Sequence, residues 1–160
     1  KNKNVPAMLT AFAKAKIPHE FMFFLSGNSD VELESLITSL GIEKRVRYLG
    51  FIEESDLPKI YKGAHATLFA SLMEGFGLPI IESMASGTPV LTSDTSSLPE
   101  IAGGSALCVN PTDISAIQAG IEKLVNDRTF YLDCVVKGLE RAKDFSWEKT
   151  AAETWETILS

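Results

Sequence analysis

The sequence has few cysteines, few histidines and no long apolar run, and each shortage excludes a class of protein. Only two cysteines and two histidines occur among its 160 residues, and they do not have the spacing of a zinc site. Cys108 and Cys134 stand among apolar neighbours, which favours two reduced thiols in the core of a cytoplasmic protein. His65 lies between two alanines before an apolar run, so we interpret it as a packed histidine.

Positive charge is also scarce. Fifteen Lys and Arg residues stand against 21 Asp and Glu residues, which gives a net charge of -6. An acidic chain without a basic run is a poor candidate for binding nucleic acid. No apolar stretch approaches the roughly 20 residues of a membrane-spanning helix. Hydrophobic residues make up 45% of the chain, and its length predicts one globular domain over residues 1–160.

Short apolar runs alternate with amphipathic segments along the whole chain. The runs predict five buried strands, at 21–25, 46–51, 66–70, 90–92 and 106–109. The amphipathic segments predict helices at 5–15, 29–39, 55–63, 79–87, 97–103, 113–126, 128–143 and 146–159. Alternation of this kind predicts an α/β, Rossmann-like fold, a parallel sheet with helices on both faces. Such sheets bind ligands at the carboxyl ends of their strands.

Three sequences predict helix starts. Ser29-Asp30-Val31-Glu32 and Ser97-Leu98-Pro99-Glu100 have the pattern of a capping box, and Ser146 precedes the last predicted helix. The first of these explains Asp30-Val31-Glu32 better than a metal-binding acidic motif does. We therefore predict no metal site there.

The segment around which the chain is organised is Glu74-Gly75-Phe76-Gly77-Leu78-Pro79-Ile80-Ile81-Glu82. It follows the predicted strand 66–70, and Pro79 suits the first turn of a helix because its missing N–H is not needed there. A strand, a glycine loop and a helix in this order present free backbone N–H groups to an anion.

The two glutamates that bracket this loop favour hydroxyl groups, because a phosphate repels a carboxylate. Glu82 lies about one turn into the helix and tilts back toward its start, where it can reach a diol such as a ribose. Glu74 lies on the other side of the anion position, where a second polyol could bind. Hydroxyls at both ends and a phosphate between them describe a nucleotide sugar. The residues alone also allow a solvated Glu74 and a Glu82 favoured only by the helix dipole.

This segment resembles the Glu–x7–Glu signature of retaining GT-B glycosyltransferases, in particular glycosyltransferase family 4 (group 1). The resemblance continues through Glu82-Ser83-Met84-Ala85-Ser86-Gly87-Thr88-Pro89 and Leu98-Pro99-Glu100-Ile101-Ala102-Gly103, and it covers nearly the whole chain. It implies the C-terminal, donor-binding half of an enzyme that moves a hexose-type sugar from a nucleotide-diphosphate sugar to an acceptor hydroxyl. It also implies that a first strand and an N-terminal acceptor domain precede this chain, and it allows peripheral membrane association at the inner face through that domain.

The resemblance further implies the roles of particular residues. Glu74 would contact the transferred sugar and Lys3 the diphosphate, with Lys1 as a competing match for the family's lysine. The implied donor-binding residues are Glu82, Gly75, Phe76, Gly77, Leu78, Gly27, Gly50, Phe51, Ile52 and Leu57. The donor is the only small molecule implied, with no metal and no further cofactor. Two other interpretations stay open: a solvated terminal Lys3, and Phe51 as an ordinary core residue.

Three alternative functions are open to a chain with this pattern. A nucleotide-sugar epimerase of GT-B architecture would need acid and base residues that the sequence does not show. A catalytically silent binding or regulatory module would keep the fold alone. Hydride transfer is disfavoured because Gly75-Phe76-Gly77 lacks the third glycine of a dinucleotide fingerprint. Retaining transfer in the family is described as front-side displacement assisted by the leaving phosphate, so this part alone should bind donor and hardly turn over.

The last two predicted helices contain Phe145, Trp147 and Trp155. We favour local packing of these rings on the sheet. The family resemblance offers a second interpretation, in which the terminal helix contacts the other domain.

Overall fold

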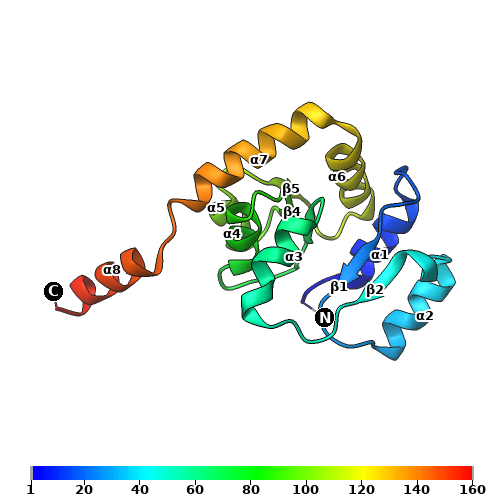
Figure 1. Cartoon of the computed structure of the whole chain (residues 1–160), viewed down its shortest axis with the longest axis horizontal. Coiled ribbons are helices and arrows are strands. Elements are labelled where there is room, and N and C mark those ends of the chain that lie inside the picture. The colour runs from blue at the N-terminus through cyan, green and yellow to red at the C-terminus, as the bar shows by residue number, and fades with distance from the viewer. Residues whose placement is uncertain (1, 160) are drawn as a thin grey trace.

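The structure, a computed structural model, describes residues 2–159 and consists of short parallel strands flanked by helices (Figure 1). The helices are α1 (Val5–Lys14), α2 (Val31–Leu40), α3 (Leu57–Gly63), α4 (Leu78–Ala85), α5 (Leu98–Ala102), α6 (Ile114–Asn126), α7 (Arg128–Ala142) and α8 (Trp147–Leu159). The strands are β1 (Phe23–Leu25), β2 (Val46–Tyr48), β3 (Thr67–Phe69), β4 (Val90–Ser93) and β5 (Leu107–Val109). Two 3₁₀ turns, η1 (Glu43–Arg45) and η2 (Glu54–Asp56), precede β2 and α3.

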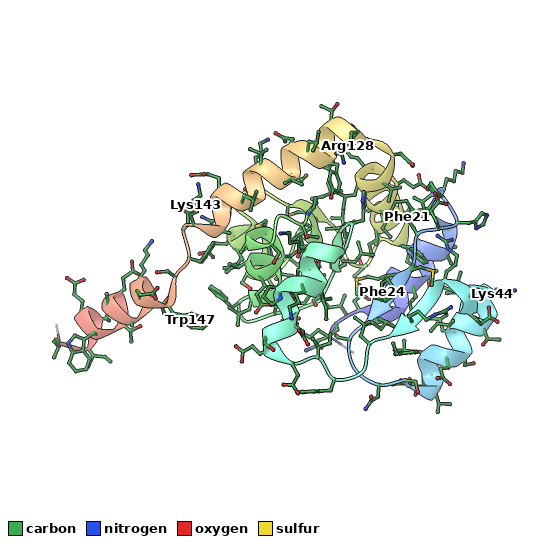
Figure 2. The ribbon with its side chains drawn as sticks, in the orientation of Figure 1. Phe21, Phe24, Lys44, Arg128, Lys143 and Trp147 are labelled. Atoms are coloured by element: carbon green, nitrogen blue, oxygen red, sulfur yellow. The ribbon has the colours of Figure 1, made fainter. Side chains whose placement is uncertain are left out.

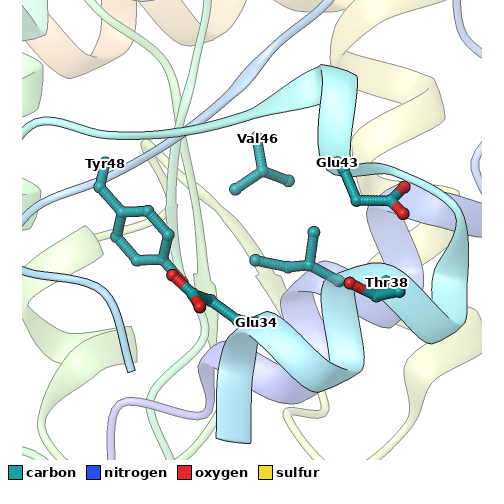
Figure 3. Close-up of a pocket in the computed structure, with 6 residues that line it drawn as sticks. Glu34, Thr38, Glu43, Val46 and Tyr48 are labelled. Carbon is teal, nitrogen blue, oxygen red and sulfur yellow. The ribbon is translucent and has the colours of Figure 1, made fainter. Parts of the chain in front are cut away.

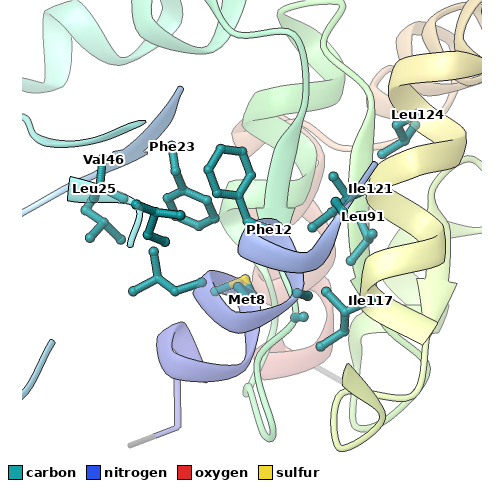
Figure 4. Packing of buried hydrophobic residues seen from close by; sticks show 14 of the residues in the cluster. Met8, Phe12, Phe23, Leu25, Val46, Leu91, Ile117, Ile121 and Leu124 are labelled. Carbon is teal, nitrogen blue, oxygen red and sulfur yellow. The ribbon is translucent and has the colours of Figure 1, made fainter. Parts of the chain in front are cut away.

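The strands divide into two sheets. β1 pairs with β2, and β3, β4 and β5 pair in that order, all in parallel. Parallel strands with helices on both faces are therefore confirmed, but the described strands do not form one continuous sheet as predicted. Side-chain packing joins the two sheets instead. Phe12 of α1 meets Phe23 of β1 edge to face, with ring centroids 5.3 Å apart, and one apolar core contains both Val46 and Leu91 (Figure 4).

Helices cover both faces of the three-stranded sheet because neighbouring side chains of a strand point to opposite faces. In β4, Leu91 belongs to the core shared with α1 and α6, while the preceding residue, Val90, packs with Ile80 and Met84 of α4. All four side chains are at most 1% exposed. The glycine loop is thus anchored at both ends, by the buried residues Ala70 and Ser71 that follow β3 and by the buried face of α4.

The helices start where the sequence predicts, but the predicted side chain does not always accept the capping hydrogen bond. Asp30, and not Ser29, caps α2 by accepting hydrogen bonds from the backbone N–H groups of Glu32 and Leu33. Ser146 accepts from the N–H of Lys149 at the start of α8, as predicted. Ser97 does not cap α5, so the predicted capping box there is wrong. The hydroxyl of Ser97 instead contacts the carbonyl oxygens of Glu74 and Phe76 in the glycine loop.

Helix α8 extends away from the rest of the molecule (Figure 1), and none of its residues is buried. Trp147 is 73% exposed where the chain leaves the body (Figure 2), and Trp155 is 63% exposed. The prediction that these two rings pack locally on the sheet is therefore wrong. Phe145, just before α8, does pack locally, edge to face on Phe76 with centroids 6.2 Å apart.

His65 and Cys134 are packed as the sequence predicts, whereas Cys108 is only partly buried. Nε2 of His65 lies 3.1 Å from the carbonyl oxygen of Leu124, and its ring stacks on that of Tyr131. Both cysteines are free, and burial raises the pKa of each thiol.

Candidate functional site

The loop between β3 and α4 forms the centre of the candidate site. Gly77 has a φ of +127° immediately before α4, and a Cβ there would lie 2.9 Å from Cδ2 of Leu98. Both the backbone conformation and the space exclude a side chain. Within residues 2–159, nothing accepts a hydrogen bond from the backbone N–H of Phe76, Gly77 or Leu78. These N–H groups and the positive end of the α4 dipole are available to an anion.

Glu74 lies in this loop, with a carboxylate side chain that is only 18% exposed. Nζ of Lys3 donates a hydrogen bond to Oε1 of Glu74 at 2.8 Å and forms an ion pair with it. Burial by itself raises the pKa of the Glu74 carboxyl. The hydrogen bond and charge of Lys3 act in the opposite direction, and the net pKa lies below the ordinary 4.5. The carboxylate is therefore ionised at neutral pH.

Asn4 explains how Lys3 comes to lie beside Glu74. Nδ2 of Asn4 donates to the carbonyl oxygen of Ala70, after β3, at 2.9 Å and to that of Pro111, after β5, at 2.7 Å. Asn4 has a φ of +53°, a left-handed conformation that asparagine tolerates better than most residues. The segment before α1 is thus fastened to the carboxyl ends of two strands.

Lys3 remains 63% exposed although it is paired with Glu74. Its Nζ also lies 5.0 Å from the centroid of the Phe69 ring. The structure therefore brings this lysine to the loop that carries Glu74. Lys1, the competing match for the family's lysine, lies outside the described residues.

Two serines after β4 hold the backbone of the glycine loop. Oγ of Ser96 donates to the carbonyl oxygen of Glu74 at 2.6 Å and accepts from its N–H at 3.2 Å. Oγ of Ser97 approaches the carbonyl oxygens of Glu74 and Phe76 at 3.0 and 2.8 Å. Ser96 also has a φ of +60°, which is uncommon outside glycine. Sequence reasoning missed both serines as site residues, because their partners lie more than 20 positions away.

Glu82 lies about one turn into α4, and its Oε2 accepts a hydrogen bond from the hydroxyl of Tyr61 in α3 at 2.9 Å. From the sequence, Tyr61 is only an apolar residue of its helix. Burial, followed by the hydrogen bond and the charge of Glu82, raises the pKa of the Tyr61 phenol well above its ordinary range. Tyr61 therefore stays protonated and can donate at any physiological pH.

A second group of predicted residues lies at the carboxyl ends of β1 and β2. Gly27 and Gly50 form a two-way backbone bridge, with N–H to O distances of 2.8 and 3.1 Å. Phe51 follows this bridge and is 85% exposed, so its interpretation as a core residue is wrong. Ile52 and Leu57 are half-buried, and Leu57 is the first residue of α3. The segment after the bridge thus contains one exposed ring and two half-buried apolar side chains.

Other features of the described chain lie apart from this site. Within residues 2–159, no three His, Cys, Asp or Glu side chains gather where they could hold a metal ion. None of the helices in that range combines the length and apolar character needed to cross a bilayer. A cavity of about 250 Å³ lies between α2 and β2, and none of its lining residues is a predicted site residue (Figure 3). It is lined by Glu34, Ile37, Thr38, Glu43, Val46 and Tyr48.

Residues 1–141 match the family described as Glycosyl transferases group 1. The chain belongs to this family. O-antigen chain mannosyltransferase B of Escherichia coli is 36% identical over 157 residues, which cover 95% of this group 1 chain and 41% of that protein. The chain therefore spans well under half the length of this relative.

Solved structures of glycosyltransferases share the fold of this group 1 chain. Sucrose-phosphate synthase of Thermosynechococcus elongatus matches with a TM-score of 0.87 at 27% identity, over 98% of this chain and 42% of that one. The C-terminal domain of a group 1 glycosyl transferase from Francisella tularensis matches with a TM-score of 0.79 at 23% identity, over 89% and 79% of the two chains. The predicted fold, that of the C-terminal half of a GT-B glycosyltransferase, is confirmed.

The ion pair at the site predicts a measurable titration. In Lys3→Gln the pKa of Glu74 should rise, because burial remains while the ammonium charge is lost. Carbon-13 NMR of the glutamate carboxyls measures this pKa. Since the pKa of Glu74 is lowered in the folded chain, the pair adds stability at neutral pH that is lost as the pH falls below 4.5.

Lys59→Gln is the matched control, because it breaks an ion pair with Asp56 in a different part of the chain. It should leave the titration of Glu74 unchanged. An unchanged pKa in Lys3→Gln would show that the pair does not persist in solution.

Proposed function

We propose that this chain is the donor-binding domain of a retaining glycosyltransferase, which moves a hexose-type sugar from a nucleotide-diphosphate sugar to an acceptor hydroxyl. The observation that carries the proposal is the arrangement of the glycine loop. Free N–H groups stand at the start of α4, and along the chain they come after Glu74, whose carboxylate is paired with Lys3, and before Glu82, whose carboxylate accepts a hydrogen bond from Tyr61. Family membership and the mannosyltransferase relative support a sugar as the transferred group.

The diphosphate of the donor would bind at the start of α4. The N–H groups of Gly77 and Leu78 and the helix dipole offset its negative charge. Lys3 adds a full positive charge, and an ammonium group has three hydrogens to donate. One hydrogen goes to Glu74, which leaves two for phosphate oxygens. The same lysine keeps the nearby carboxylate from repelling the donor.

The two glutamates would bind the ends of the donor. Glu74 would accept hydrogen bonds from hydroxyls of the transferred sugar, and Glu82 from the ribose. Phe51 and the bridge between Gly27 and Gly50 would border the nucleoside, with Gly75, Ile52 and Leu57 contributing surface. No metal ion and no further cofactor enter this proposal.

Transfer would proceed by front-side displacement. As the bond between the anomeric carbon and the phosphate oxygen breaks, negative charge grows on the leaving diphosphate. Lys3 and the backbone N–H groups would stabilise that charge. The leaving phosphate takes the proton of the acceptor hydroxyl, which attacks from the same face and retains the configuration. The scheme therefore needs no separate protein base.

The acceptor would be bound by another part of the protein. This chain covers 41% of the Escherichia coli relative, so we propose that an N-terminal acceptor domain completes the enzyme. The exposed apolar side chains of α8, such as Trp155, would contact that domain. Because acceptor contacts and water exclusion would come from there, this chain alone should bind donor without turnover.

Calorimetric titration with UDP-, GDP- and ADP-sugars tests the proposal. We expect binding of at least one of these donors. Glu82→Ala and Glu74→Ala should each weaken it about tenfold, since a hydrogen bond to a charged group contributes roughly 1.5 kcal/mol or more. Glu148→Ala, in the exposed helix α8, is the matched control and should change nothing. A folded chain that binds none of these donors would be a silent module, and the proposal would fail.

A further inference from the structure

Tyr61 lies beside a proposed ligand-binding carboxylate without being a predicted site residue itself. Helices α3 and α4 pack against each other, and the hydroxyl of Tyr61 donates to Oε2 of Glu82 across their interface at 2.9 Å. Within residues 2–159, no other side chain donates to this carboxylate. Oε1 of Glu82 and a remaining lone pair of Oε2 are thus available to a ligand.

The backbone of Tyr61 is held by the segment that follows the helix of Glu82. Oγ1 of Thr88 donates to the carbonyl oxygen of Tyr61 at 2.6 Å. Thr88 is only 3% exposed and follows the end of α4. The phenol of Tyr61 thus meets α4 while its backbone meets the segment that follows α4, which leaves the ring little freedom to turn away from Glu82.

A diol can donate two hydrogen bonds to one carboxylate only if the carboxylate plane faces it. A glutamate on a helix surface has three rotatable bonds, and ordering them on binding reduces affinity. A neutral donor that holds one oxygen beforehand removes part of that cost. The Tyr61 hydroxyl is such a donor, and its own oxygen can still accept a hydrogen bond.

We propose that Tyr61 is a positioning residue, which orients the Glu82 carboxylate to receive the ribose hydroxyls of the donor nucleotide. This inference rests on the proposed function. The role of a positioning residue differs in one measurable respect from that of a residue that only stabilises the packing of two helices. Loss of a purely structural contact would weaken the binding of every nucleotide equally. Loss of a positioning residue would weaken only the binding of ligands that carry the ribose hydroxyls.

The test compares ligands with and without those hydroxyls. Calorimetry of this chain uses ADP, GDP and UDP, and the 2′,3′-dideoxy counterpart of whichever binds. Tyr61→Phe should weaken the ribonucleotide about five- to tenfold, in keeping with the loss of a hydrogen bond to a charged group. Binding of the dideoxynucleotide should stay within about twofold, because hydroxyls that are absent make no bond to lose. Tyr131→Phe, whose ring stacks on His65, is the matched control.

Glu82→Ala separates this inference from the proposed function. If Glu82→Ala weakens the ribonucleotide alone and Tyr61→Phe weakens both ligands or neither, only the role of Tyr61 is overturned. If Glu82→Ala does not distinguish the two ligands, or if none of the three nucleotides binds, the proposed function fails with it. In the Glu82→Ala background, Tyr61→Phe should have no further effect on ribonucleotide affinity.

A measurement on the unaltered chain covers the case in which Tyr61→Phe does not fold. Tyrosine labelled with carbon-13 at Cζ reports the hydrogen bonding of each of the three tyrosines. The ribonucleotide should shift the Tyr61 signal, and the dideoxynucleotide should shift it much less. Equal shifts with both ligands would overturn the inference.

Discussion

Replacing Gly77 with alanine should lower the free energy of unfolding by about 2–4 kcal/mol, the sum of a strained backbone conformation and a steric overlap. The φ of +127° at Gly77 is a conformation that residues with a Cβ rarely adopt. The added Cβ would also lie 2.9 Å from Cδ2 of Leu98, a fully buried side chain that would have to move. Urea denaturation followed by circular dichroism measures the change.

Gly75→Ala is the matched control, two residues earlier in the same loop. No atom lies within 4 Å of a Cβ built at Gly75, and its φ is outside the left-handed region. This variant should stay within about 0.5 kcal/mol of the parent chain. Gly77→Ala should also reduce donor binding, because relief of the strain moves the N–H groups at the start of α4. Equal stabilities for the two variants would contradict the geometry described for Gly77.

Asn4→Asp should destabilise the fold by about 2–4 kcal/mol, because it removes a donor and places a charge against two acceptors. Nδ2 of Asn4 donates to the carbonyl oxygens of Ala70 and Pro111, and an ionised carboxylate has no hydrogen to give. A negative charge at the start of α1 would gain only about 0.3–1 kcal/mol from the helix dipole. Repulsion therefore outweighs that gain. Thermal and urea unfolding above pH 6 measure the effect.

Asn2→Asp adds the same charge two residues earlier, on an exposed residue whose side chain makes no described hydrogen bond. It should leave stability nearly unchanged. Asn4→Asp should also release Lys3 from Glu74, so that the pKa of Glu74 rises as it does in Lys3→Gln. A stable Asn4→Asp chain with an unchanged Glu74 titration would show that Asn4 does not fasten the segment that carries Lys3.

Much of the fold could be predicted from periodicity, because strands and helices are encoded locally. The run from Ala66 to Ala70 and the apolar face that contains Ile80 and Met84 were sufficient to place β3 and α4. Strand ends were less predictable. For example, β2 ends at Tyr48, because Gly50 has a φ of +68° and turns the chain toward Gly27. The division into two sheets could not be predicted, since pairing between distant strands leaves no local signal.

Candidate site residues could be recognised from the sequence where they belong to one segment, but contacts between distant segments could not. The glycine loop and its two glutamates are visible as a single motif. Tyr61 and Glu82 are 21 positions apart, and Lys3 and Glu74 are 71 apart, so their contacts require the fold. Ser97 shows the opposite failure. A local rule predicted a helix cap, but a carbonyl oxygen brought close by the fold receives its hydrogen bond instead.

The division of the strands also affects how the two halves of the proposed site are spaced. The Gly27–Gly50 bridge follows the strands of one sheet and the glycine loop follows a strand of the other, and the core between the sheets contains apolar side chains such as Phe12 and Met8. No backbone ladder among the described strands sets the width of that core. Changes of side-chain volume on α1 could therefore widen or narrow the distance between a nucleoside and its phosphates while both loops keep their own conformations. Homologous enzymes would then have a route to donors of different size that leaves the reacting groups untouched.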